Sequence, residues 1–175
     1  YLRDLIDRRL MVCDQAESKW NADNEFFWRH RTQDENVPPE VIEEMSELYG
    51  AGELDRAEAL ARLFVDSYED YADGHNYLGL VARERGLVDE AIEHFERAVD
   101  KGRGLFPKRF PKKHYWIDID TRPYMRGLRN LAQTLPLVDR VDEALEYCER
   151  LERECGDTQT SWRIRAAIEL VAGRP

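Results

Sequence analysis

A short motif returns after 34 residues in this chain of 175 residues, and this spacing limits the possible folds more than any other feature. The segment Gly-Glu-Leu-Asp-Arg-Ala at 52–57 reappears as Gly-Leu-Val-Asp-Glu-Ala at 86–91. A third copy keeps Asp142, Glu143 and Ala144, 53 positions further on, which equals one unit of 34 residues and an insertion of 19. Periods of this length are typical of folds in which one small supersecondary unit is stacked on the next.

The residues at three recurring positions are those that two packed helices and a tight turn require. A glycine after a helical run can take the left-handed conformation that ends the helix. An aspartate at the beginning of the next helix meets free backbone N–H groups and the positive end of the helix dipole. An alanine one turn later lets the two helices pack closely. The three units carry Gly52, Gly86 and Asp139 in the turn, Asp55, Asp89 and Asp142 at the helix start, and Ala57, Ala91 and Ala144 inside the helix.

The second unit resembles a tetratricopeptide repeat. Residues 72–105 have Leu78-Gly79, Gly86, Asp89-Glu90-Ala91, Phe95 and Ala98 at the spacing of that family. The resemblance implies pairs of antiparallel helices that stack into a short right-handed α-solenoid, an all-α fold with an N-terminal helix and one inter-repeat insertion. The apolar residues recur every three or four positions, which independently favours helices.

The other two units depart from the family pattern. The unit at 38–71 has Met45 where the family has glycine and Ala61 where it has an aromatic residue. In the unit at 125–158, Asp139 replaces the turn glycine and Pro136 shortens the first helix, so we expect a turn of different shape.

These units divide the chain into six parts. Residues 1–37 are predicted to form an N-terminal helix and a connector that pack on the repeats. The repeats occupy 38–71, 72–105 and 125–158, separated by an insertion at 106–124. Residues 159–175, with Trp162, are predicted to form a C-terminal capping helix that covers the last core layer.

The composition narrows the class of protein. With 42% hydrophobic and 35% charged residues, the chain has the composition of a folded globular protein, and no apolar stretch is long enough for a membrane span. The odd number of cysteines, Cys13, Cys148 and Cys155, lacks metal-ligand spacing, which favours reduced thiols and a cytoplasmic location. We expect Cys148 and Cys155 to be small buried hydrophobic residues.

The insertion differs from the rest of the chain in charge. The formal net charge is −10, which argues against nucleic acid as the partner of the whole protein. Residues 101–117 contain six of the 26 basic residues and no acid, which leaves 20 basic against 36 acidic residues, a balance of −16, elsewhere. The loop residues proposed for binding are Lys108, Arg109, Lys112, Lys113 and Trp116. They either grip an acidic peptide or single-stranded nucleic acid, or fold back on the acidic repeats.

A second stretch, from Thr121 to Arg126, is similar to the opening of a repeat helix in bacterial tetratricopeptide proteins and in the suppressor-of-tumorigenicity family. Asp120 or Thr121 can cap this helix and Pro123 can occupy its first turn. We therefore expect capping, not metal binding, from the acidic residues at its start.

In the tetratricopeptide family, the first helix of each pair lines the surface that receives a peptide. Carried over by register, this implies a groove whose arginines suit a carboxylate or an acidic segment. Ile42 and Ser46 stand where the chaperone-type carboxylate clamp of the family would need lysine and asparagine, so chaperone C-termini are not the expected ligand. The predicted groove residues are Asn76, Leu80, Arg83, Arg126, Arg129, Asn130, Gln133 and Arg163.

The sequence contains no recognisable catalytic constellation. A nucleophile with its base, a phosphate-binding glycine loop and clustered metal ligands are all absent, and His75 and His94 fit repeat surface or packing positions. We therefore predict a non-enzymatic module without a cofactor or metal that binds another protein or peptide, with homo-oligomerisation left open. The alternatives are a regulatory repeat domain of a larger enzyme, and binding of nucleic acid or another acidic ligand through the insertion.

Overall fold

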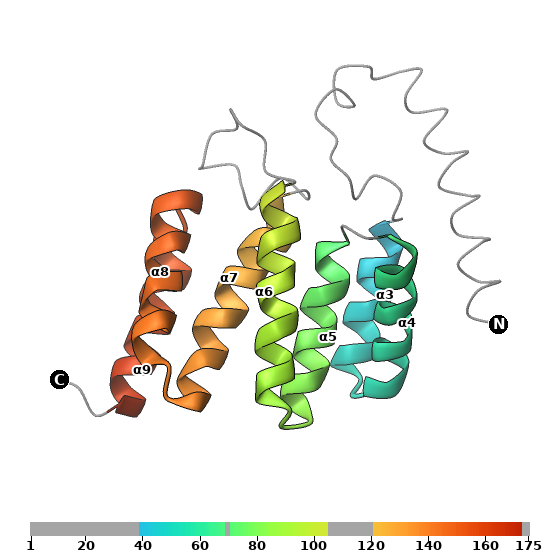
Figure 1. Cartoon of the computed structure of the whole chain (residues 1–175), viewed down its shortest axis with the longest axis horizontal. Coiled ribbons are helices and arrows are strands. Elements are labelled where there is room, and N and C mark those ends of the chain that lie inside the picture. The colour runs from blue at the N-terminus through green and yellow to red at the C-terminus, as the bar shows by residue number, and fades with distance from the viewer. Residues whose placement is uncertain (1–38, 69–70, 105–120, 173–175) are drawn as a thin grey trace, which may run out of the picture.

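The computed structural model describes residues 39–68, 71–104 and 121–172 (Figure 1). No β-strand occurs in these ranges, so the predicted all-α fold is confirmed. The elements are α3 (Pro39–Gly50), α4 (Leu54–Ser67), α5 (Ala72–Glu84), α6 (Val88–Gly104), α7 (Arg122–Thr134), the 3-10 helix η4 (Leu135–Val138), α8 (Val141–Cys155) and α9 (Thr158–Ala172).

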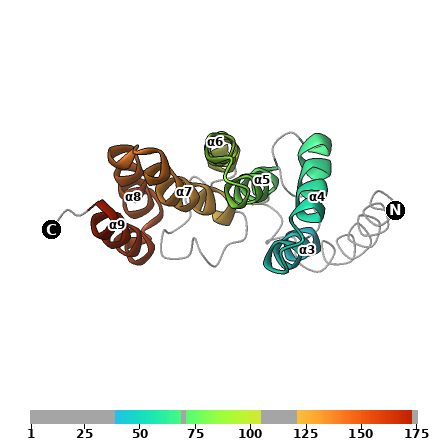
Figure 2. The same cartoon turned by 90° about the horizontal axis from the view of Figure 1, so that it is seen from below.

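The helices stack as antiparallel pairs in the order of the sequence (Figure 1). α3 pairs with α4, α5 with α6 and α7 with α8, while α4 packs on α5 and α6 on α7 to join successive pairs. α3, α5, α7 and α9 lie toward one side of the stack, and α4, α6 and α8 lie toward the other (Figure 2). This arrangement is the predicted solenoid, in which each unit contacts its neighbours.

The apolar stripes of the helices form two core clusters. One cluster lies among α3, α4 and α5 and includes Met45 and Phe64, and the other extends to α9 and includes Phe95 and Leu131. Leu80 of α5 packs against both clusters and connects them. Burial of each large side chain contributes about 1.5–3 kcal/mol. The three alanines inside the second helices, Ala57, Ala91 and Ala144, are completely buried, as expected for close helix contacts.

The turns within the three pairs share one backbone geometry. Gly52 and Gly86 have φ values of 75° and 76°, and Asp139 takes the same left-handed conformation with φ 59°. The expectation of a differently shaped third turn is therefore wrong for the turn itself, since aspartate is among the few non-glycine residues that tolerate this conformation. Each turn is closed by a bond from an N–H to the carbonyl five residues earlier: Glu53 to Leu48, Leu87 to Ala82 and Arg140 to Leu135.

Pro136 acts one turn before Asp139. Proline has no backbone N–H to donate, and the chain continues from α7 as the 3-10 helix η4 before the left-handed residue. Pro136 therefore changes the end of the first helix of this unit, as expected, but the backbone geometry of the turn stays the same.

Glu154 of α8 holds both ends of the inter-repeat insertion. The Tyr124 hydroxyl, in the first turn of α7, donates a hydrogen bond to Glu154, and Arg103 near the end of α6 forms an ion pair with it at 2.9 Å. Burial, together with the hydrogen bond to Glu154, raises the pKa of Tyr124 to about 12, so the hydroxyl remains a donor. Gly102 completes the junction, because an added Cβ would lie 2.7 Å from the backbone nitrogen of Tyr124.

The helix after the insertion begins at Arg122, three residues before the predicted unit boundary at 125. Pro123 lies in its first turn as expected. Thr121 holds the N-cap position, but its side chain makes no capping hydrogen bond. The predicted N-terminal helix and connector at 1–37, and most of the insertion with its five candidate loop residues, lie outside the described residues.

Cys148 and Cys155 are free and buried, as predicted for small hydrophobic residues. Burial raises the pKa of both thiols, that of Cys155 to about 12. Both therefore stay protonated and unreactive at neutral pH. Cys13 lies outside the described residues.

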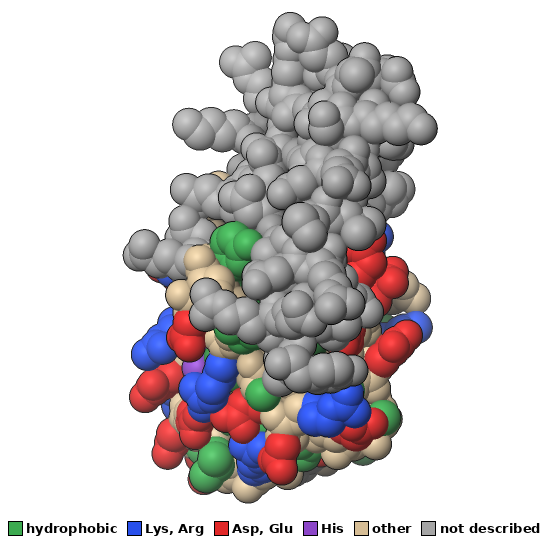
Figure 3. Space-filling view, turned by 90° about the vertical axis from the view of Figure 1, so that its right-hand side faces the viewer, with side chains coloured by type: hydrophobic (Ala, Val, Ile, Leu, Met, Phe, Trp, Pro, Cys, Tyr) green, Lys and Arg blue, Asp and Glu red, His purple; other side chains and the backbone are tan. Residues whose placement is uncertain are grey.

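The two ends of the stack differ in surface character. At the end formed by α3 and α4, acidic and basic side chains interleave over the part that the structure describes (Figure 3). At the other end, α9 buries Ile164 and Ile168 against α7 and α8 but leaves Trp162 72% and Leu170 83% exposed. The C-terminal helix thus covers the last core layer with one face and keeps a second apolar face open.

Candidate functional site

The side of the stack lined by the first helices, α3, α5, α7 and α9, carries the predicted ligand residues. α3 and α9 at the two ends stand further toward this side than α5 and α7, so the stack curves around it (Figure 2). We call this side the inner face. Direct packing of α3 on α5, α5 on α7 and α7 on α9 makes it one continuous surface.

A buried polar cluster joins α5 to α7 at the inner face. Asp73 is completely buried and forms an ion pair with Arg126. The Asn76 amide donates to Asp73 at 3.2 Å and to the Pro123 carbonyl at 2.9 Å, and the Asn130 amide donates to the Asn76 oxygen at 3.3 Å. Burial acts to lower the pKa of Arg126, but Asp73 raises it overall, so the guanidinium charge is firmly held. This cluster satisfies its own polar groups and fixes the spacing of the two helices.

Arg129, one turn further along α7, lacks such a partner. Its Nε–H is buried and donates to no hydrogen-bond acceptor, and its guanidinium forms no ion pair within the described residues. Burial, followed by the positive charges of Arg126 and Arg83, lowers the pKa of Arg129, while Asp157 and Tyr77 act weakly in the opposite direction. Because arginine remains protonated in proteins, the site holds an uncompensated positive charge. A buried donor without a partner costs about 1–3 kcal/mol.

The eight predicted groove residues differ in their access to a ligand. Asn76 and Asn130 are buried and use their amides within the fold, because they face the neighbouring helix. Arg163 makes no hydrogen bond or ion pair within the described residues. The half-buried members are Leu80, Arg83, Arg126 and Arg129, and the exposed ones are Gln133 and Arg163.

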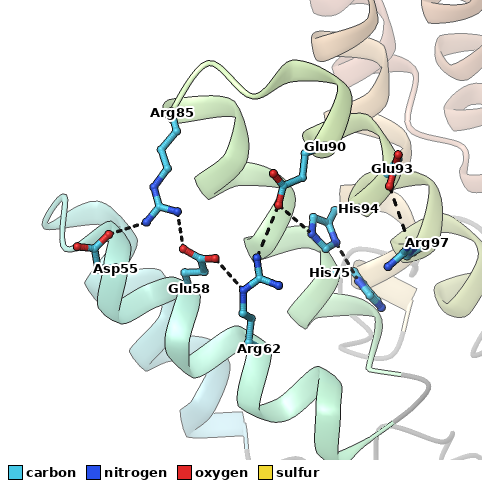
Figure 4. A network of polar contacts seen from close by, with 9 residues as sticks. All are labelled: Asp55, Glu58, Arg62, His75, Arg85, Glu90, Glu93, His94 and Arg97. Atoms are coloured by element: carbon cyan, nitrogen blue, oxygen red, sulfur yellow. Dashed lines mark hydrogen bonds and ion pairs between the residues drawn. The ribbon is translucent and has the colours of Figure 1, made fainter.

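A chain of charged contacts crosses the opposite side of the stack, from α4 to α6 (Figure 4). Arg85 bridges Asp55, at 2.6 Å, and Glu58, while Arg62 joins Glu58 at 2.7 Å to Glu90 at 3.6 Å. The hydrogen bonds to Arg62 and Arg85 lower the pKa of Glu58. Such exposed pairs contribute about 0–1 kcal/mol each, so this network is a solvated surface and offers no unsatisfied group to a ligand.

Two histidines lie at the inner end of this network (Figure 4). The Nδ1 atoms of His75 on α5 and His94 on α6 are 3.3 Å apart, and both residues are buried. Burial, and then the charges of His94, Arg97 and Lys101, lowers the pKa of His75 to about 4. Burial and Arg97 also lower the pKa of His94, against a smaller opposite effect of Glu90. At neutral pH the pair is therefore uncharged, and one Nδ1–H donates to the other nitrogen, which makes this a packing contact.

The sequence reasoning missed Asp73, the carboxylate that neutralises Arg126. A signal for it was present, since Asp73 and Arg126 are 53 residues apart and hold the same register position in successive units. Equal positions of adjacent repeats lie side by side in a solenoid. Opposite charges at one register position therefore predict an ion pair between units.

Two negative findings hold for the described part of the chain. No group of three or more His, Cys, Asp or Glu side chains there is placed to hold a metal ion. None of the helices in these ranges combines the length and apolar character needed to cross a membrane.

Comparison with known proteins identifies the repeats. Residues 43–105 match the model of a tetratricopeptide repeat family. The matched range covers most of the first two units that the 34-residue spacing defines. No curated protein and no solved structure matches the chain.

Proposed function

We propose that the inner face binds a segment of a partner protein and places a carboxylate of that segment at Arg129. The proposal builds on the match of residues 43–105 to a tetratricopeptide repeat family, whose repeats generally mediate contacts between proteins. One observation carries the proposal. The buried Nε–H of Arg129 has no acceptor, and the positive charges of Arg126 and Arg83 act on the same guanidinium, in a chain of net charge −10.

The electrostatics of the inner face favour an anionic ligand group. Asp73 already neutralises Arg126, so the remaining positive charge comes chiefly from Arg83 and Arg129. A carboxylate can bind a guanidinium through two parallel hydrogen bonds, and such charge-assisted bonds are about twice as strong as neutral ones. Arg129 as a whole residue is half-buried, so part of it is accessible to such a group. Leu80, half-buried on α5, offers an apolar contact for a neighbouring side chain of the ligand.

The test compares peptides of graded acidity against the full chain and an Arg129→Gln variant. Peptides from an array are ranked by binding, and the affinity of the best acidic peptide is measured by fluorescence anisotropy. Removal of a charged hydrogen bond worth about 1.5–3 kcal/mol lowers affinity roughly 10- to 100-fold. Arg56→Gln is the matched control. Arg56 is an exposed arginine on α4, and among the residues that the structure describes it pairs only with Glu53, at the start of the same helix.

Binding by the two variants decides whether the ligand carboxylate binds at Arg129. Binding that prefers acidic peptides, fails in Arg129→Gln and persists in Arg56→Gln supports the inner-face carboxylate site. Equal binding by both variants, or no preference for acidic sequences, contradicts it.

The basic insertion is the competing location for an acidic ligand. Charge reversal of Lys108, Arg109, Lys112 and Lys113 in one variant leaves the Arg129 site unchanged. If that variant loses binding while Arg129→Gln retains it, the ligand binds the insertion and the inner-face proposal is wrong.

A further inference from the structure

Half-buried apolar side chains of α3 and α5 lie on the inner face beside the proposed arginine site. Ile42 and Tyr49 of α3 and Leu80 of α5 pack against the core cluster among α3, α4 and α5 and remain partly exposed. Ile42 and Tyr49 lie on one face of α3 with Ser46 between them, at intervals of four and three residues. Ser46 is exposed and short, so a ligand side chain can reach both neighbours. We call Ile42, Tyr49 and Leu80 the apolar patch.

The repeat register places the apolar patch on the same surface as Arg129. Ser46 lies 34 residues before Leu80, and Leu80 lies 53 residues before Gln133, so the three hold one register position in successive first helices. Ile42 holds the position of Arg129 two units earlier, because 34 and 53 residues separate them. α5 packs directly on both α3 and α7. A segment that crosses the first helices of the stack therefore meets the apolar patch and Arg129 in succession.

Contacts within the fold hold the Tyr49 ring in place. Its hydroxyl donates a hydrogen bond to Glu84 at 2.8 Å, and its ring meets Tyr77 edge-on, with the ring centroids 6.4 Å apart. Burial and the hydrogen bond to Glu84 raise the pKa of Tyr49, against an opposite effect of Arg83, so the hydroxyl stays a neutral donor. The ring is thus ordered before a ligand binds, which lowers the entropic cost of the contact.

The charges around the apolar patch disfavour a second acidic residue of the ligand at this place. Glu84 is exposed and its carboxylate lies at the Tyr49 hydroxyl, where it repels another carboxylate. α3 itself contains no basic residue. Arg83 acts on the pKa of both Tyr49 and Arg129, so it lies between the patch and the arginine site. The positive charge of the inner face thus begins beyond the patch, on the side of α7.

We infer that the partner segment carries, besides the acidic residue at Arg129, an apolar residue about four positions away that packs on the apolar patch. This inference rests on the proposed function and adds a second anchor to the same site. Packed helices lie about 8–10 Å apart, so the boundary of α3 and α5 is about 12–15 Å from α7. An extended segment advances about 3.3 Å per residue and covers that distance in roughly four residues. The segment is therefore recognised by a spacing and not by acidity alone.

A peptide series tests this spacing against the full chain. Each peptide carries one glutamate and one leucine in an uncharged polar background, at separations from one to eight positions and in both chain directions. The reference peptide has serine in place of the leucine. Fluorescence anisotropy should show that the leucine strengthens binding about 5- to 20-fold at separations near four, because its side chain leaves water there. At separations of one and eight the leucine should add little.

A substitution within the apolar patch tests the location. Ile42→Lys puts a charge into the patch and should abolish the advantage of the leucine peptides without weakening the reference peptide. Leu63→Lys is the matched control, because Leu63 is also half-buried and packs on the same core cluster, but lies on α4. It should leave the leucine advantage unchanged. Ile42→Thr and Leu63→Thr repeat the comparison with a smaller change if far-UV circular dichroism shows that a lysine variant loses helix.

Three results would overturn the inference. They are a leucine that adds nothing at any separation, equal losses of the leucine advantage in the Ile42 and Leu63 variants, and a second glutamate that binds as tightly as the leucine. The carboxylate site is judged separately, by the loss of the reference peptide in Arg129→Gln. The inference can therefore fail while the proposed function stands. If Arg129→Gln and the unmodified chain bind the reference peptide equally, both are wrong.

Discussion

The buried pair His75 and His94 makes the stability of the fold sensitive to mild acid. The folded-state pKa of His75 is about 4, below its usual value of 6.5, mainly because of burial. Between these two values the unfolded chain binds a proton that the folded chain does not, so stability is complete above pH 6.5 and falls as pH falls towards 4. From these two pKa values, the loss between pH 7.5 and pH 5 is about 2 kcal/mol.

The perturbation that isolates this effect is His75→Leu, because Leu128 fills the same register position in the next unit. His75→Gln is the second variant, since its amide can still hydrogen-bond to His94 but cannot titrate. Urea unfolding followed by circular dichroism gives the free energy of unfolding of all three proteins at pH 7.5 and pH 5. The quantity of interest is the pH-dependent loss in the unmodified chain minus the loss in each variant, which removes the contribution of other titrating groups.

We expect this difference to be about 2 kcal/mol for both variants. The charged groups around the pair, Arg97, Lys101 and Glu90, are retained, so their contributions cancel. A difference near zero for His75→Leu and His75→Gln would refute the reasoning, because it would mean that His75 accepts a proton in the folded state as easily as in the unfolded chain.

Substitutions at three further positions test the packing and the turn, each by urea unfolding at pH 7.5. Asp73→Ala should cost about 2–3 kcal/mol, because it leaves the half-buried Arg126 charge without its partner. Gly79→Ala should cost about 1–3 kcal/mol, since the new Cβ would lie 2.4 Å from the Phe95 ring. Asp139→Gly should stabilise by up to about 1 kcal/mol and Asp139→Ala should destabilise, because the backbone at this position is left-handed. A neutral Asp73→Ala, a neutral Gly79→Ala, or equal effects of the two Asp139 variants would each contradict the corresponding argument.

The inner face shows where reasoning from register succeeds and where it stops. Register alone brought Arg126 and Arg129 to the same surface, and the structure places both on α7 there. Register did not separate their roles. Arg126 is held by Asp73, while Arg129 has no partner, and this difference depends on the side chain that each arginine meets on the neighbouring helix.

The exposed apolar face of α9, which carries Trp162 and Leu170, shows the same limit of reasoning from register. The sequence identified a terminal helix and Trp162, and it predicted that this helix would cover the last core layer. Ile164 and Ile168 do so. Only the packed structure shows that Trp162 and Leu170 face away from the stack, because their exposure depends on which of two apolar sides α8 and α7 occupy.

The sequence by itself determined the period, the helical class, the pairing of helices and the turn positions. These features depend on local chemistry: residues that end helices, residues that begin them, and small residues where helices cross, each repeated at a fixed interval. The tertiary structure decided that Asp139 keeps the turn geometry of Gly52 and Gly86, that the two asparagines are buried, and which arginine is left without a partner. Those outcomes depend on contacts between side chains from different units, and a repeat spacing specifies that two positions are neighbours without specifying which of their polar groups are satisfied.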